Sequence, residues 1–178
     1  MLIKLERVFD RIFDYIGYLS AVLMILMMVN VFYDVIMRYF FRKSSIALQE
    51  SEWHLFAMVF LLGISYALKE DGHVRVDIIY DSLHRRKQAV INIVGAILFL
   101  IPFSFLIAFG STDFVLEAYH THEISGDPGG LTHRWLIKAL VPFSFYLLVL
   151  SSVGFIIKNI NLFRRSSSEA DKELGSRV

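Results

Sequence analysis

Four long runs without a charged residue constrain the fold of this 178-residue chain more than any other feature. They cover residues 15–33, 53–68, 88–112 and 139–157. A helix needs about 20 mostly apolar residues to cross a hydrocarbon core of ~30 Å. The first, third and fourth runs are long enough once their edges are included, and the second is long enough if it begins near residue 47. We therefore predict an all-α integral membrane protein with four transmembrane helices, at about 14–40, 47–68, 88–114 and 134–158.

Composition excludes several classes of function. Hydrophobic residues make up 56% of the chain, above the roughly 45–50% that is usual for soluble domains. There is no cysteine, which excludes thiol catalysis, iron–sulfur clusters and disulfides. Basic residues are not interleaved with aromatic ones, so nucleic acid is not an expected partner. No Ser, His and Asp fall at a spacing that supports nucleophilic catalysis, and we predict that the chain is not an enzyme.

The distribution of Lys and Arg predicts the orientation of the chain. Residues 1–14, 69–87 and 158–178 together hold thirteen of these cations, and the segments on the other side of the spans hold four. Cytoplasmic segments of membrane proteins are enriched in Lys and Arg. We therefore expect both termini to be cytoplasmic and the loop 113–133 to lie on the opposite side.

The segments outside the spans have patterns of their own. Residues 2–14 are amphipathic, which fits either an interfacial helix or the polar start of a longer first helix. Residues 69–87 are expected to lie on the cytoplasmic membrane surface, with their basic end toward anionic lipid. The sequence GDPGG predicts a turn, and Pro102 and Pro142 predict kinks within spans three and four. Residues 1–165 form one predicted membrane domain, followed by a disordered tail at 166–178.

A polar stripe interrupts the first apolar run. Asn30, Asp34 and Arg38 follow one another at intervals of four residues, so a helix places them on one face. Ionisable residues within a span are costly unless they are paired, and by default they suggest function. The structural alternative is an Asp34–Arg38 pair near the outer interface, with the guanidinium reaching the headgroups. In either case Asn30 and Asp34 require a protein-facing environment.

The beginning of the second span also invites a functional interpretation. Glu50 and Glu52 are candidate ion ligands, but carboxylates in a first helical turn also suit the helix dipole. Trp53 fits the aromatic belt at a membrane interface. The structural interpretation is favoured for all three residues.

The histidines raise the alternatives of zinc and haem. His120 and His122 lie near two acidic residues, but spacing fixes no third zinc ligand. His54 and His133 lie near the same predicted membrane face, which keeps a haem-binding membrane anchor as an alternative. We predict no metal site and no cofactor in this chain.

The second span and the loop after it resemble a known family. The sequence LQESEWHLFAMVFLLGISYALKEDGHVRVDIIYDSL is similar to the small membrane subunit of TRAP transporters, the DctQ-like family of tripartite, ATP-independent periplasmic importers. Arg38 falls at the family's arginine in the first span, and the resemblance extends over about residues 10–160. Many members have Trp followed by two glutamates at the beginning of the second span. In this chain the order differs, because Glu50 and Glu52 precede Trp53. The matching positions are Glu50, Gly63, Ala67, Gly72, His73, Val74, Val76 and Asp77.

The resemblance implies a division of labour among three proteins. A soluble periplasmic protein captures an organic acid, and a large multi-span subunit carries the substrate and sodium sites across the bacterial inner membrane. The small subunit is a static scaffold that binds the large subunit and helps to dock the binding protein. Asn30, Asp34 and Arg38 are then expected to lie against the partner subunit or the neighbouring spans.

The outer loop is the expected docking surface, because residues 113–133 include four carboxylates and no Lys or Arg, a pattern that favours electrostatic steering. These carboxylates are Asp113, Glu117, Glu123 and Asp127. Two other classes of function remain open, a haem-binding anchor of an electron-transfer complex and an autonomous small channel or transporter. We find no internal repeat of the kind that many self-sufficient transporters have.

Overall fold

The computed structural model describes residues 2–72, 80 and 82–175, with side chains as far as residue 164. Within these ranges every regular element is helical, which confirms the all-α class. Part of the interfacial segment predicted at 69–87, residues 73–79 and 81, lies outside the described ranges, and its position at the membrane surface stays a prediction. The elements are α1 (Leu2–Tyr39), α2 (Ile46–Lys69), α4 (Arg85–Gly95), the π-helix η1 (Ala96–Leu100), α5 (Ile101–Gly110), α6 (Thr112–His120) and α7 (Trp135–Gly175).

Four stretches of helix are long and apolar enough to cross a membrane, as predicted. They are Leu2–Tyr39, Ile46–Lys69, Arg85–His120 and Trp135–Arg164. The third is formed jointly by α4, η1, α5 and α6. With 1.5 Å of rise per residue, the 30 residues of the fourth span extend over about 45 Å and reach beyond a ~30 Å hydrocarbon core.

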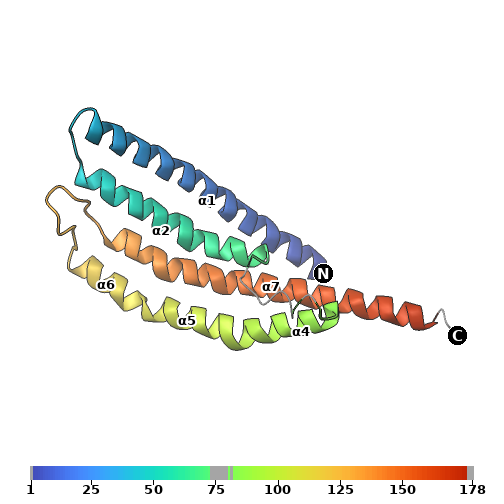
Figure 1. Ribbon diagram of the computed structural model, residues 1–178. Helices are drawn as coiled ribbons and strands as arrows, with labels where there is room; N and C mark the ends of the chain where they lie inside the picture. Colours follow the sequence, from blue (N-terminus) through green and yellow to red (C-terminus); the bar gives the residue numbers. More distant parts are fainter. Residues whose placement is uncertain (1, 73–79, 81, 176–178) are drawn as a thin grey trace.

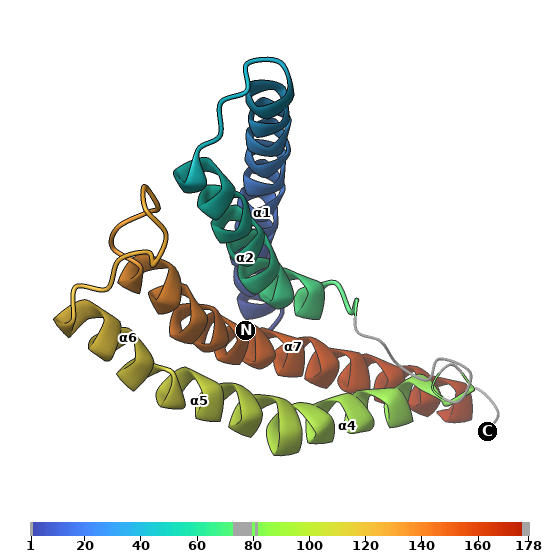
Figure 2. The same ribbon diagram turned by 60° about the vertical axis from the view of Figure 1, so that its left-hand side comes forward.

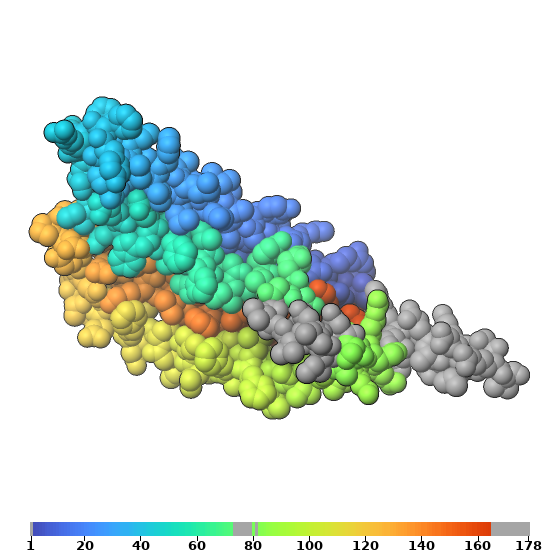
Figure 3. Space-filling view, viewed as in Figure 1, coloured from blue at the N-terminus to red at the C-terminus, as the bar shows by residue number. Residues whose placement is uncertain are grey.

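The helices form two pairs that meet along α7. Helix α1 packs antiparallel to α2, and α7 lies between α2 and the curved α4–α6 segment (Figure 1). Seen from another side, the α1–α2 pair is set at an angle to the layer of α7 and α4–α6 (Figure 2). On the face in Figure 3, α7 is recessed between its two neighbours. Both chain ends lie at the same end of the bundle.

Helix α1 is continuous from Leu2 to Tyr39, so the amphipathic segment is the beginning of the first span. Two glycines permit its close packing. A Cβ added at Gly17 would lie 2.6 Å from the Tyr66 ring of α2, and one at Gly154 of α7 would lie 3.0 Å from Phe9. At Gly17 a larger residue would therefore force the Tyr66 ring to move, and at Gly154 it would press tightly on Phe9.

The third span is irregular where the sequence places a proline. Because Pro102 has no N–H, the backbone ladder of hydrogen bonds is interrupted there, and the π-helical turn Ala96–Leu100 immediately precedes it. The Ser104 hydroxyl donates to the Leu100 carbonyl at 2.6 Å, and the segment is bowed (Figure 2). Helix α7, in contrast, runs through Pro142 as one element.

Polar side chains join the helices beside a small apolar core. The core consists of Leu68, Ala96, Leu148 and Phe155. The buried Ser151 of α7 donates to the Ser65 carbonyl of α2 at 2.9 Å. Because lipid is as apolar as a leucine side chain, such packing and hydrogen bonds, and not burial from water, hold spans together.

Helix α7 continues to Gly175, through most of the tail for which the composition predicts disorder. The disorder predicted for residues 166–178 stays a prediction, and the composition of this segment is also compatible with a helix. Residues 169–174, EADKEL, are mostly good helix formers. They extend a helix that the span has already nucleated, so the costly first turn does not have to be formed again.

Candidate functional site

The first residue of the polar stripe joins α1 to α2, and the other two pair with each other within α1. The Asn30 amide donates to the Leu48 carbonyl of α2 at 3.1 Å. Asp34 is 1% exposed, and its Oδ2 accepts a hydrogen bond from Arg38, whose side chain is 47% exposed. The other carboxylate oxygen of Asp34 is buried with no partner among the described residues. Asp34 is therefore buried within this chain, Asn30 is partly buried against α2, and Arg38 is exposed.

Glu50 binds the outer loop with both carboxylate oxygens. Its Oε1 accepts a hydrogen bond from the Ser125 hydroxyl, and its Oε2 accepts one from the Leu131 N–H at 2.5 Å. Glu50 is buried although it lies in the first turns of α2. We call this contact of Glu50, Ser125 and Leu131 the outer clasp, because it attaches the head of the second span to the loop before the fourth.

The GDPGG turn presents the loop to Glu50. The Gly130 N–H donates to the Asp127 carbonyl at 3.0 Å, and Gly129 has a φ of +84°. Pro at the second position and a positive φ at the third are the marks of a type II turn, which confirms the predicted turn. At Gly130, an added Cβ would lie 2.4 Å from Ser125 Oγ and 2.8 Å from Glu50 Oε2. The outer clasp therefore closes only around a residue without a side chain.

The four predicted docking carboxylates have different surroundings. Glu123 forms ion pairs with Lys138 and, at 3.9 Å, with Arg134, so its charge is compensated within the chain. Asp113 and Glu117 are exposed one turn apart on α6, and Asp127 is exposed at the turn. The acidic surface that remains available consists of Asp113, Glu117 and Asp127.

The residues after Glu50 lie at the outer end of α2. Trp53 is half-exposed, and the Arg134 guanidinium lies 5.7 Å from the centre of its ring. The rings of Trp53 and His54 are 4.9 Å apart. Glu52 Oε1 and His54 Nε2 are buried without a hydrogen-bond partner among the described residues.

The histidines do not gather into a ligand set. Among the described residues, no three His, Asp or Glu side chains are grouped so that they would hold a metal ion. His120, His122 and His133 are all exposed, and the His133 ring is within 2.8 Å of the Thr132 hydroxyl. The prediction of no metal and no cofactor stays a prediction.

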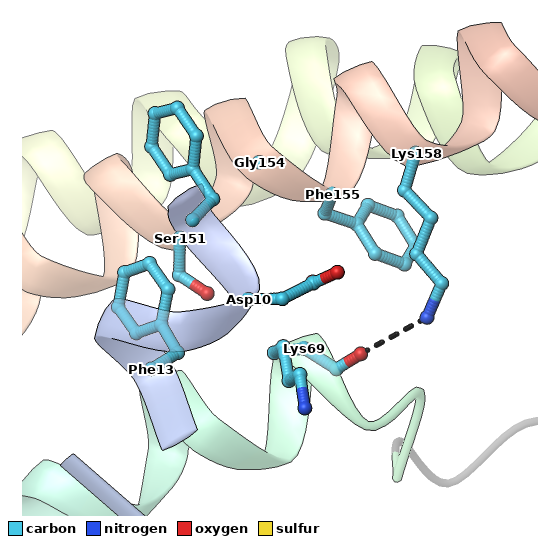
Figure 4. A pocket seen from close by; sticks show the side chains of 8 residues that line it. Asp10, Phe13, Lys69, Ser151, Gly154, Phe155 and Lys158 are labelled. Carbon is cyan, nitrogen blue, oxygen red and sulfur yellow. Dashed lines mark hydrogen bonds between the residues drawn. The ribbon is translucent and has the colours of Figure 1, made fainter. Parts of the chain in front are cut away.

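A second polar cluster, which sequence reasoning missed, lies at the end of the bundle that holds both termini. Lys69 of α2 is 2.7 Å from Asp14 of α1, and Lys158 of α7 donates to the Lys69 carbonyl at 3.2 Å (Figure 4). Asn161 of α7 donates to Glu6 of α1 at 2.6 Å. Asp14, Lys69 and Lys158 each stand directly beside a charge-free run, which was the available signal.

Among the other family positions, Gly63 has no atom within 4 Å of an added Cβ. Gly72 follows the C-terminus of α2, and its N–H donates to the Ala67 carbonyl at 2.9 Å. The Asp71 N–H donates to the Leu68 carbonyl, and Asp71 has a φ of 62°, so this helix end is a Schellman motif. His73 and Asp77 lie outside the described residues.

The fold and these contacts define a class of protein. It is a multi-pass membrane protein with four spanning helices, in which buried polar side chains bind the helices to one another.

Comparison with known proteins gives the family. Residues 27–162 match the family of tripartite ATP-independent periplasmic transporters, DctQ component. A Haemophilus influenzae protein described as a TRAP transporter small permease protein is 28% identical over 152 residues, which cover 84% of this chain and 88% of the relative. A second protein of that description and organism is 29% identical over 135 residues, covering 75% and 84%. The chain belongs to the DctQ family of small TRAP transporter permease subunits.

Proposed function

We propose that this chain is the non-translocating scaffold subunit of a sodium-coupled importer of an organic acid. It packs against a large multi-span permease subunit, which carries the sodium and substrate sites. A periplasmic binding protein delivers the substrate and docks partly on the acidic loop of this chain. The complex lies in the bacterial inner membrane, with both termini of the small subunit in the cytoplasm. Membership of the DctQ family supports the partners, and the excess of Lys and Arg at one end supports the orientation.

One observation carries the non-translocating role. Asp34 and Glu50, the two buried carboxylates of the described spans, are both hydrogen-bonded within the chain. The cavity between α1, α2 and α7, lined by Lys69 and Lys158, holds about 10 Å³. That cavity has room for about one water molecule and too little for a carboxylic acid. The hollow beside Asn92 is larger, about 320 Å³, but the rest of its lining is apolar. These polar groups therefore serve adhesion between helices.

Reconstitution into liposomes tests this role. We expect uptake of substrate only when the small subunit, the large subunit and the binding protein are all present. The small subunit alone should conduct neither solute nor ions above the level of empty liposomes. Sodium-dependent uptake by the small subunit alone would overturn the proposal, and a Soret band in the purified chain would indicate the haem-binding anchor instead.

Neutralising the exposed acidic surface should slow docking. We expect the triple change Asp113→Asn, Glu117→Gln and Asp127→Asn to reduce the association rate of the binding protein about tenfold at low salt, because steering depends on complementary charge. Above about 0.5 M salt the effect should vanish, because charges are then screened over a few ångströms. Stopped-flow association measures both.

The matched control removes two charges of the opposite sign at the same end of the bundle. Arg42 and Lys43 are exposed in the loop between α1 and α2, and Arg42→Gln with Lys43→Gln should leave association unchanged or make it faster. If the acidic triple variant associates at the wild-type rate at every salt concentration, the outer loop is not part of the docking surface.

A further inference from the structure

A basic groove lies where the third and fourth spans meet, at the end of the bundle that holds both termini. Its volume is about 550 Å³, and its lining combines three basic side chains with three apolar ones. The basic residues are His84, Arg86 and Lys87, at the start of α4, and the apolar residues are Val90, Ile91 and Phe163. We call this feature the α4–α7 groove.

The order of residues along α4 matches the depth profile of a bilayer. Lys87 precedes Val90 by three residues, or about 4.5 Å of helix. The basic residues therefore lie at headgroup level when the apolar ones lie at the edge of the hydrocarbon. Phe163, at the end of the fourth span, contributes to the same apolar wall, and the Arg86 guanidinium lies 4.6 Å from the centre of its ring. This contact holds one cation over the groove.

We propose that the α4–α7 groove is a binding site for one anionic phospholipid, such as phosphatidylglycerol. Arg86 and Lys87 bind the phosphate, and the first methylenes of an acyl chain lie on Val90, Ile91 and Phe163. Charge complementarity favours an anionic headgroup over a zwitterionic one, because only the former brings a net negative charge to these cations. The apolar wall favours a lipid over a free phosphate, because a free phosphate has no apolar group to bury against it.

The test is native mass spectrometry of the full chain in detergent, titrated with phosphatidylglycerol or with phosphatidylcholine of the same acyl chains. The wild-type chain should bind the anionic lipid at least about tenfold more tightly. The change Arg86→Gln with Lys87→Gln should abolish most of this preference, since each cation near a membrane surface is worth about fivefold in affinity. Lys87→Gln alone, which leaves the Arg86–Phe163 contact in place, should remove about fivefold.

The control is Arg7→Gln with Arg11→Gln, which removes two exposed cations at the same end of the bundle and should keep the preference. Equal binding of both lipids to the wild type would overturn the proposal, as would an equal loss in the control variant. Displacement of the lipid by millimolar inorganic phosphate would show an anion site without lipid specificity. If the Arg86→Gln, Lys87→Gln variant keeps its preference for the anionic lipid but no longer co-purifies with a large subunit, the groove is a protein interface and the proposal is overturned.

Discussion

Replacing Gly130 by alanine is expected to open the outer clasp and to destabilise the protein by about 1–3 kcal/mol, the usual cost of overpacking. The added methyl would lie 2.4 Å from Ser125 Oγ and 2.5 Å from its Cβ. The Ser125 side chain is too short to bend away from the added methyl, so the loop backbone must move. Once it moves, the hydrogen bonds from Ser125 and Leu131 to Glu50 are lost as well. Thermal unfolding in detergent should report the loss of stability.

Gly126 provides the matched control in the same loop. Nothing lies within 4 Å of a Cβ added there, so Gly126→Ala should unfold at the wild-type temperature. Glu50→Ala should reproduce the effect of Gly130→Ala by another route, because it leaves a backbone N–H and a hydroxyl without their acceptor. In Gly130→Ala and in Glu50→Ala, limited proteolysis should cut residues 121–134 faster than in wild type. Equal stability of Gly130→Ala and Gly126→Ala would show that the outer clasp contributes nothing.

Sequence analysis predicted the four spans well because the bilayer imposes a simple requirement. Every backbone polar group in the hydrocarbon must be satisfied within its own segment, and only long apolar helices achieve this here. The spacing of Asn30, Asp34 and Arg38 also left an Asp34–Arg38 pair open as one alternative, because residues four apart in a helix are neighbours. These are local features, and local features can be read from the order of residues.

The outer clasp was not predicted, because its partners are distant in the chain. Glu50 is separated by 75 residues from Ser125 and by 81 from Leu131, and no periodicity links them. The helix-dipole interpretation of Glu50 treated the carboxylate as a local feature. The second glycine of the turn, Gly130, was the available signal. A type II turn requires only Gly129, so Gly130 suggested a close approach by another group.

The pairing of Glu123 was not predicted, for a related reason. Residues 113–133 contain no cation, but Arg134 and Lys138 follow immediately and pair with Glu123. The first turn of α7 begins one residue after Arg134, which directs both side chains back toward the loop. The fold decides which residues lie beside the loop, and so it also decides which of the loop's charges are neutralised.

The largest effect within the membrane is expected for Arg38→Ala. This change leaves the Asp34 carboxylate, which is 1% exposed, without its charge partner. Breaking a buried ion pair in this way costs about 3–5 kcal/mol, and we expect about 3 kcal/mol because Arg38 itself is half-exposed. The hairpin of α1 and α2 should loosen, with a lower unfolding temperature in detergent and less co-purification with a large subunit.

The reciprocal change should be much milder. Asp34→Ala removes the buried charge itself, and Arg38 can turn its guanidinium to the headgroups, so we expect a loss of about 1 kcal/mol, close to that of an exposed pair. The double variant should resemble Asp34→Ala, since no buried charge remains. A double-mutant cycle on unfolding free energies measures this asymmetry. Equal costs for the two single changes, adding up in the double variant, would show that Asp34 and Arg38 are independent and that their ion pair does not stabilise the fold.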